Sequence, residues 1–138
     1  DYPICVPLYD YSGKAKSFQG RAVKKLEHGR KTMCPIGFSM SGLVFACRNT
    51  VRYLRGEESY RKFWIVEGEI DFLTLKSMPG FKDICVIGIK NGSIPFFKEM
   101  KFPAAAEVVI ATDNEQDRSG NIPRKTTADR PRKILGYK

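Results

Sequence analysis

The sequence lacks the features by which several classes of protein are recognised. Its four cysteines lie far apart with no Cys-x-x-Cys spacing, and its single histidine, His28, has no Cys or His neighbour, so we expect no zinc site. No apolar run approaches the roughly 20 residues that span a bilayer, and no signal-peptide pattern opens the chain. We therefore expect reduced thiols, no membrane partner and a cytoplasmic location (the host-cell cytoplasm for a phage-encoded protein).

The composition that is present is typical of a folded chain. The sequence has 138 residues, of which 42% are apolar, with nine Phe, six Tyr and one Trp. This length suits one domain, or a domain with a smaller neighbour, and the apolar content excludes a disordered segment. The chain starts at Asp1 and stops at Lys138 without an obvious structural boundary, so we expect it to be a fragment of a longer protein.

The net charge of +9 is unevenly distributed along the chain. Residues 1–62 carry twelve Lys or Arg against five Asp or Glu, a net charge of +7. Residues 63–113 have a net charge of −2, and residues 114–138 a net charge of +4. A slightly acidic middle with basic flanks is the pattern of a polyanion-binding protein with a separate acidic site.

The N-terminal third has the pattern of a β-rich region. Short apolar stretches alternate with turn-forming Asp, Ser and Gly. The residues after the last apolar stretch have the pattern of a short helix that ends at Gly56. We expect strands at Pro7–Tyr9, Ala15–Val23 and Ser41–Cys47, and a brief helix from Asn49 or Thr50 to Leu54. Residues 1–62 are thus predicted to form a small, basic, β-rich subdomain.

From Phe63 the pattern changes to alternating strands and helices. We expect strands at Phe63–Val66, Asp83–Ile89 and Ala106–Thr112, with helices at Ile70–Met78 and from Pro95 to about Lys101. A β-α-β-α-β order implies right-handed crossovers and a parallel sheet with flanking helices. Residues 63–138 are therefore predicted to be an α/β domain.

Carboxylates stand at the exits of two of these strands. Glu67, Glu69 and Asp71 follow the first strand at once, and Asp113 opens the acidic stretch after the third. An unpaired carboxylate in a dry interior is costly, whereas a cleft that holds a cation would remove the cost. Ligands of parallel sheets bind at the carboxyl ends of the strands, so we expect one shared cation site there. Oxygen ligands without His or Cys favour Mg²⁺ or Mn²⁺ over zinc.

These residues resemble the Toprim domain, the metal-binding fold shared by primases, topoisomerases and some nucleases. "VEGEIDFLTL" (residues 66–75) and "VVIATDNEQDRSG" (residues 108–120) are similar to its paired motifs, a Glu after the first strand and Asp-x-Asp after the third. "EGEID" is particularly close to the primase–helicases of phages. "PLYDYSGKAKSFQGR" (residues 7–21) and "RKTMCPIGFSMSGLVFA" (residues 30–46) resemble the basic subdomain that precedes Toprim in DnaG-like primases.

The resemblance implies a role for each matching carboxylate. Glu67 matches the family's glutamate, a metal ligand or general acid/base, and Asp71 matches the acid that follows it in primases. Asp113 matches the first Asp of Asp-x-Asp because it directly follows the apolar strand, and Glu115 takes the second position. The acidic segment is longer than the family's Asp-x-Asp-x-Ala-Gly, so Asp117 stays open as the second acid. The implied catalytic residues are Glu67, Asp113 and Glu115, and Asp71 and Asp117 join them as implied metal ligands.

Basic residues are expected to contact template or nucleotide phosphates. Arg21 matches the Gly-Arg of the primase subdomain and Lys31 matches its downstream Lys. The full set of basic candidates is Arg21, Lys24, Lys31, Arg48, Arg52 and Lys90.

Other residues near these motifs are expected to be structural. We predict that Glu69 is a solvated residue in the first turn of its helix, where the helix dipole favours a carboxylate. We also predict that four aromatic side chains lie in the core and do not stack on bases. These are Phe18, Phe38, Phe45 and Phe72.

The resemblance implies a DNA primase catalytic core from a phage or mobile element. Its activity would be Mg²⁺- or Mn²⁺-dependent synthesis of short RNA from NTPs on a single-stranded DNA template, with a replicative helicase, fused or separate, as a partner. Two alternatives stay open: a Toprim nuclease that uses the same metal to cleave, and a catalytically inactive Toprim module of a replicative helicase that binds single-stranded DNA.

Overall fold

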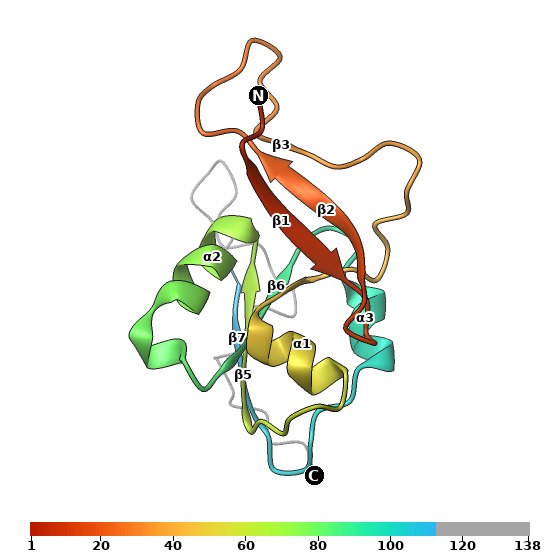
Figure 1. Ribbon diagram of the computed structural model, residues 1–138, viewed down its shortest axis with the longest axis vertical. Helices are drawn as coiled ribbons and strands as arrows, with labels where there is room; N and C mark the ends of the chain where they lie inside the picture. Colours follow the sequence, from red (N-terminus) through yellow and green to blue (C-terminus); the bar gives the residue numbers. More distant parts are fainter. Residues whose placement is uncertain (113–138) are drawn as a thin grey trace, which may run out of the picture.

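The computed structural model describes residues 1–112, which form a mixed α/β fold with two sheets and flanking helices (Figure 1). The elements in chain order are β1 (Ile4–Tyr9), β2 (Ala15–Arg21), β3 (Thr32–Met33), β4 (Phe45–Ala46), α1 (Arg48–Leu54), β5 (Lys62–Glu67), α2 (Glu69–Ser77), the 3₁₀ turn η1 (Pro79–Phe81), β6 (Cys85–Ile89), α3 (Ile94–Glu99) and β7 (Glu107–Ala111). The described residues contain no helix long and apolar enough to cross a membrane.

The larger sheet has the strand order β4-β6-β5-β7, and β5 pairs in parallel with both β6 and β7. The predicted β-α-β-α-β order is therefore confirmed. The three predicted strands are parallel to one another, as expected, but β4, which was not predicted to join this sheet, pairs antiparallel with β6 and makes the sheet mixed. β4 has only two residues, and so short an apolar segment has no periodicity from which its direction could be predicted.

β4 also bears on the expected division of the chain at residue 62. It belongs to the predicted N-terminal subdomain by sequence, yet it lies in the same sheet as β5, β6 and β7. Next to it, Val44 forms an isolated bridge with Tyr9 of β1. The chain thus connects its two sheets through the segment that precedes α1, and the position of a domain boundary stays a prediction.

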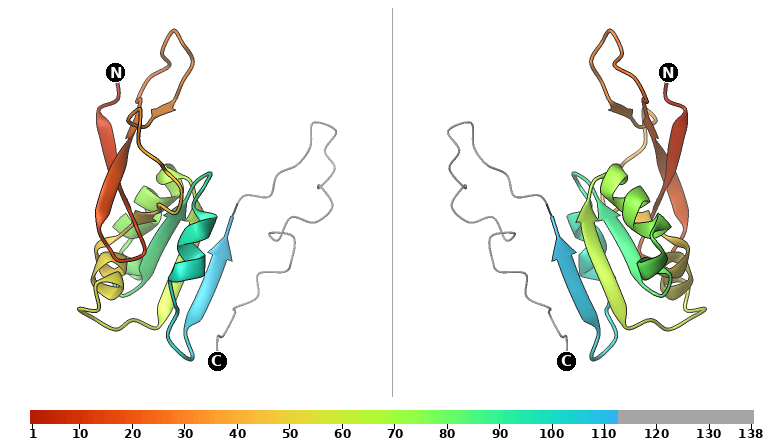
Figure 2. Two further views of the ribbon diagram at one scale, coloured as in Figure 1. Left: turned by 90° about the vertical axis from the view of Figure 1, so that its right-hand side faces the viewer. Right: turned by 90° about the vertical axis from the view of Figure 1, so that its left-hand side faces the viewer.

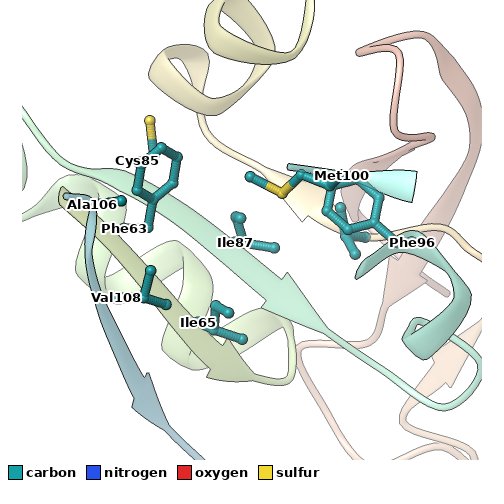
Figure 3. Close-up of a cluster of buried hydrophobic side chains, with 9 residues drawn as sticks. Phe63, Ile65, Cys85, Ile87, Phe96, Met100, Ala106 and Val108 are labelled. Atoms are coloured by element: carbon teal, nitrogen blue, oxygen red, sulfur yellow. The ribbon is translucent and has the colours of Figure 1, made fainter. Parts of the chain in front are cut away.

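The larger sheet has buried apolar side chains on both faces, as expected for parallel strands that are covered on two sides, although the edge strand β7 leaves Ile110 exposed. Phe63 and Ile65 of β5 point to one face, where they pack with Phe96 of α3 and with Met100 (Figure 3). Alternation along the strand turns Val66 to the opposite face. The core around this mixed sheet therefore lies in two layers, one on each face.

The second face is covered by α2 and by the hairpin of the smaller sheet. Phe72 of α2 stacks against Phe45 with ring centroids 5.8 Å apart, and Val6 and Leu8 of β1 join the same cluster. Gly88 of β6 lies directly beneath the two rings. The smaller sheet is thereby held against the larger one by an apolar cluster that β1 shares with β4 and α2.

The smaller sheet is antiparallel with the order β1-β2-β3. Its hairpin turn is organised by Asp10, whose Oδ1 accepts hydrogen bonds from Ser12 and from the backbone N–H of Lys14. Burial alone would raise the pKa of Asp10, but these hydrogen bonds outweigh it and hold the pKa below its ordinary value. Figure 2 shows one face of the hairpin against the helices and the other directed away from the molecule.

The expected burial of four aromatic side chains is only half right. Phe45 and Phe72 are buried, as predicted. Phe18 and Phe38 are 48% and 65% exposed, so the prediction is wrong for these two. Phe18 lies on the outward-facing side of β2, and Phe38 lies in the loop between β3 and β4.

Candidate active site at the carboxyl edge of the sheet

The acidic motif begins where β5 passes directly into α2. Gly68 is the residue between them, and it has a φ of 80°, which an L side chain adopts only with strain. Its N–H donates to the carbonyl of Ile89 at the end of β6. Because the turn is this tight, Glu67 and Glu69 leave the backbone in different directions. Glu67 is exposed at the end of β5, whereas Glu69 is buried.

Glu69 is 7% exposed, and the expectation that it is solvated is wrong. Its Oε1 accepts a hydrogen bond from the guanidinium of Arg21, with which it forms an ion pair. Its Oε2 accepts from Gln19 Nε2 at 3.1 Å. Both carboxylate oxygens are thus satisfied by β2, a strand of the other sheet. The physical reason for the burial is this pairing, since an unpaired carboxylate could not be held there.

The polar contacts continue from Gln19 to the end of β6. Gln19 Oε1 accepts from Cys34 Sγ at 3.8 Å, and Lys90 Nζ donates to the same sulfur at 3.2 Å. Lys90 directly follows β6, and Ile89 before it is paired in register with Glu67. The network therefore places two cations, Arg21 and Lys90, near the edge where β5 and β6 end.

The two carboxylates exposed at this edge are without partners in the described part of the chain. Glu67 ends β5 and Asp71 lies in the first turn of α2, and neither side-chain carboxylate makes a hydrogen bond or ion pair within residues 1–112. Unpaired, solvated carboxylate oxygens are the donor type that Mg²⁺ and Mn²⁺ prefer. The residues present therefore fit the chemistry of a hard cation.

The remaining implied ligands lie outside the described residues. These are Asp113, Glu115 and Asp117. Among residues 1–112 no group of three or more His, Cys, Asp or Glu is placed to hold a metal ion. What the structure does place is the end of β7, which runs parallel to β5 with Val66 paired to Ala111. Asp113 follows that strand after a single intervening residue, Thr112.

The basic candidates lie in three places. Arg21 and Lys90 belong to the network at the carboxyl edge, and Lys24 and Lys31 are exposed in the loop that follows β2. Arg48 and Arg52 lie elsewhere, on α1.

The contacts of α1 place it toward the amino ends of the strands. Asn49 donates a hydrogen bond to the carbonyl of Ile84, which precedes β6. Arg52 pairs with Glu58 at 2.9 Å, in the connection that leads into β5. The structure thus does not bring Arg48 and Arg52 to the edge where Glu67 lies.

Three roles in the network were not predicted from the sequence. Gln19 and Cys34 were not expected to take part, and Glu69 was not expected to be buried. The sequence shows that Ser17, Gln19 and Arg21 share one face of β2, because they alternate with Phe18, but it does not show that this face is the inner one. An apolar residue is normally assigned to the inner face, so the strand was expected to point the other way. Here the polar face is the inner one because the buried carboxylate of Glu69 accepts hydrogen bonds from Gln19 and Arg21.

Comparisons of the chain with protein-family models, with curated proteins and with solved structures found no match.

Proposed function

We propose that this chain is the catalytic core of a DNA primase, with a Toprim-like fold, that makes short RNA primers on single-stranded DNA by metal-dependent nucleotidyl transfer. The observation that carries the proposal is the position of Glu67. Its carboxylate, at the end of the central strand β5, has no partner among residues 1–112, and the cations Arg21 and Lys90 lie near the same edge of the sheet. Unpaired carboxylates next to cations are what a metal–triphosphate site requires.

The proposed roles follow the chemistry of each side chain. Glu67, Asp113 and Glu115 are the catalytic carboxylates, and Asp71 and Asp117 complete the metal ligands. A bound Mg²⁺ or Mn²⁺ would offset the charge of the triphosphate and help to activate the 3′ hydroxyl. The carboxylates of this chain would hold the ion and so help to position the hydroxyl against the α-phosphate.

The cations of the site act on phosphates. Arg21 contacts Glu69 through one guanidinium nitrogen, Nη1, and its side chain is 26% exposed. Its remaining N–H donors can therefore reach a phosphate oxygen, which a guanidinium binds with defined geometry. Lys90 has no carboxylate partner within residues 1–112. Lys24 and Lys31 extend the positive surface toward a single-stranded DNA template, and a replicative helicase, fused or separate, is the proposed partner protein.

One assay separates this function from its alternatives. The chain is incubated with single-stranded DNA template, NTPs and either Mg²⁺ or Mn²⁺, and the products are resolved on a denaturing gel. Short RNA supports the proposal, shortened DNA would identify a nuclease, and binding without either product would identify an inactive module. Glu67→Gln should abolish RNA synthesis. Glu99→Gln, which alters an exposed carboxylate on α3, is the matched control and should leave synthesis unchanged.

A further inference from the structure

The outward-facing side of the hairpin has apolar residues where a solvated strand normally has polar ones. Phe18 is 48% exposed in the middle of β2, directly opposite the exposed Pro7 of β1. Met33 of β3, paired with Gly20, is also exposed on this sheet. The same strand turns Gln19 and Arg21 inward. β2 is thus inverted, and its apolar side chains face the solvent.

A second aromatic residue lies along the same face. Phe18 and Gly20 are two residues apart on β2, so they share its outer side at a spacing of roughly 6.7 Å. A Cβ on Gly20 would lie 2.9 Å from Tyr2 Cβ and 3.5 Å from Tyr2 Cγ, which places Tyr2 directly over this glycine. The ring of Tyr2 stacks in turn on His28, with centroids 6.2 Å apart. Gly20 leaves room for Tyr2, because a side chain at this position would collide with it.

Positive charges border this aromatic row at both ends. Lys16 shares the outer side of β2 with Phe18, forms a long ion pair with Asp10 at 3.9 Å and keeps a half-exposed side chain. At the other end, Tyr2 Oη donates a hydrogen bond to the carbonyl of Arg30, whose own side chain is exposed. Residues 1–62 as a whole have a net charge of +7. The positive charges around this apolar surface therefore favour a partner that is negatively charged.

We propose that this outer face, formed by Tyr2, Pro7, Lys16, Phe18 and Met33, is a stacking surface for single-stranded DNA. Phe18 would take one base beside the Tyr2–His28 stack, while Lys16 and Arg30 contact the backbone phosphates. Aromatic side chains on an exposed sheet are a recurrent way of holding unpaired bases. The surface is separate from the carboxyl edge of the larger sheet. It depends on the proposed function only for the choice of DNA as the probe.

The test measures binding of the full chain to a fluorescein-labelled oligothymidylate of roughly 12 nucleotides by fluorescence anisotropy. Phe18→Ala should weaken binding by about 5- to 150-fold, the equivalent of 1–3 kcal/mol for one stacked base. Phe18→Tyr should retain most of the affinity, because the ring is kept. The slope of log affinity against log salt should be the same for all three proteins, since no phosphate contact has been removed.

Phe38→Ala is the matched control, because it removes a more exposed phenylalanine from a loop outside the outer face. It should bind the oligonucleotide as the unaltered chain does. Equal affinity of Phe18→Ala and the unaltered chain would overturn the proposal, as would an equal loss in Phe38→Ala. A dimer that Phe18→Ala dissociates in analytical ultracentrifugation, with DNA affinity unchanged, would instead show that the face joins two copies of the chain.

Primer synthesis by the same proteins separates this inference from the proposed function. If the unaltered chain makes no RNA but Phe18→Ala binds DNA more weakly, the stacking surface stands and the primase function fails. If the unaltered chain makes RNA and Phe18→Ala binds DNA equally well, the function stands and the stacking surface fails. Circular dichroism of Phe18→Ala checks that it is folded, which its exposed position favours.

Discussion

Arg21 of β2 and Glu69 of α2 form an ion pair across the junction of the two sheets, although they are 48 residues apart in the sequence. The pair joins the basic N-terminal part of the chain to the acidic motif after β5. Gln19 donates a hydrogen bond to the other oxygen of the same carboxylate. The guanidinium of Arg21 is therefore held at the carboxyl edge by Glu69, which is itself buried.

The first prediction is that Glu69→Gln destabilises the fold by about 2 kcal/mol. The substitution removes the buried negative charge, leaves Arg21 without its counter-ion and places an amide where an acceptor is needed. Urea unfolding followed by circular dichroism measures the change. Glu67→Gln is the matched control two residues away. It alters an exposed carboxylate without partners in the described chain and should change stability by less than about 0.5 kcal/mol. Equal effects of the two substitutions would contradict the assigned burial of Glu69.

The second prediction concerns the packing beneath α2. A Cβ on Gly88 would lie 2.9 Å from Phe72 Cβ and from Phe45 Cδ2. Gly88→Ala should therefore destabilise the fold by about 1–3 kcal/mol, because two buried rings must move apart. A Cβ on Gly80 would meet nothing within 4 Å, so Gly80→Ala should be neutral or slightly stabilising. Thermal unfolding of both variants tests this contact, and a Gly88→Ala protein as stable as Gly80→Ala would refute it.

The third prediction is that millimolar Mg²⁺ or Mn²⁺ raises the melting temperature of the full chain. An ion that binds only the folded state stabilises it by mass action. Glu67→Gln and Asp71→Asn should each reduce the gain, whereas Glu99→Gln should not. Differential scanning fluorimetry with increasing metal, with Ca²⁺ and NaCl of matched ionic strength for comparison, measures the effect. A gain that survives Glu67→Gln in full would place the ion elsewhere.

The fourth prediction is a loss of stability above pH 9. Burial raises the pKa of the Cys85 thiol to about 12 from its ordinary value of 9.0, and the neighbouring Cys47 adds to the shift. The folded state keeps the proton to about pH 12, while the unfolded state releases it above pH 9. The stability is therefore fully present below pH 9 and is lost as the pH rises toward 12. Burial also raises the pKa of Tyr60 to about 12, which acts in the same direction above pH 10.

Urea midpoints at pH 8 and pH 10.5 measure this loss. The unaltered chain should lose about 1–2 kcal/mol more over this interval than Cys85→Ala, which has no thiol at the position. The comparison uses the change with pH within each protein, so the packing defect of the variant cancels. Identical losses in the two proteins would show that the thiol does not titrate differently on folding.

The local pattern of the sequence determined the elements of the α/β part to within a few residues. The strand predicted at Phe63–Val66 is β5, and the helix predicted at Ile70–Met78 is α2. Both follow from the spacing of apolar residues and from turn-forming Gly and Pro, which are properties of neighbouring residues. The presence of carboxylates at the end of this strand was equally predictable, because Glu67 directly follows the predicted strand.

Tertiary structure alone decided which side of each element is inside. Nothing near Phe18 in the sequence indicates that it faces solvent while Gln19 faces inward, and nothing near Glu69 distinguishes it from the exposed Glu67. Both outcomes depend on the approach of β2 to α2, which brings Arg21 to Glu69. The cost of burying a charge is set by the partners that reach it in space, so a side chain whose partner is 48 residues away has no local signature of its burial.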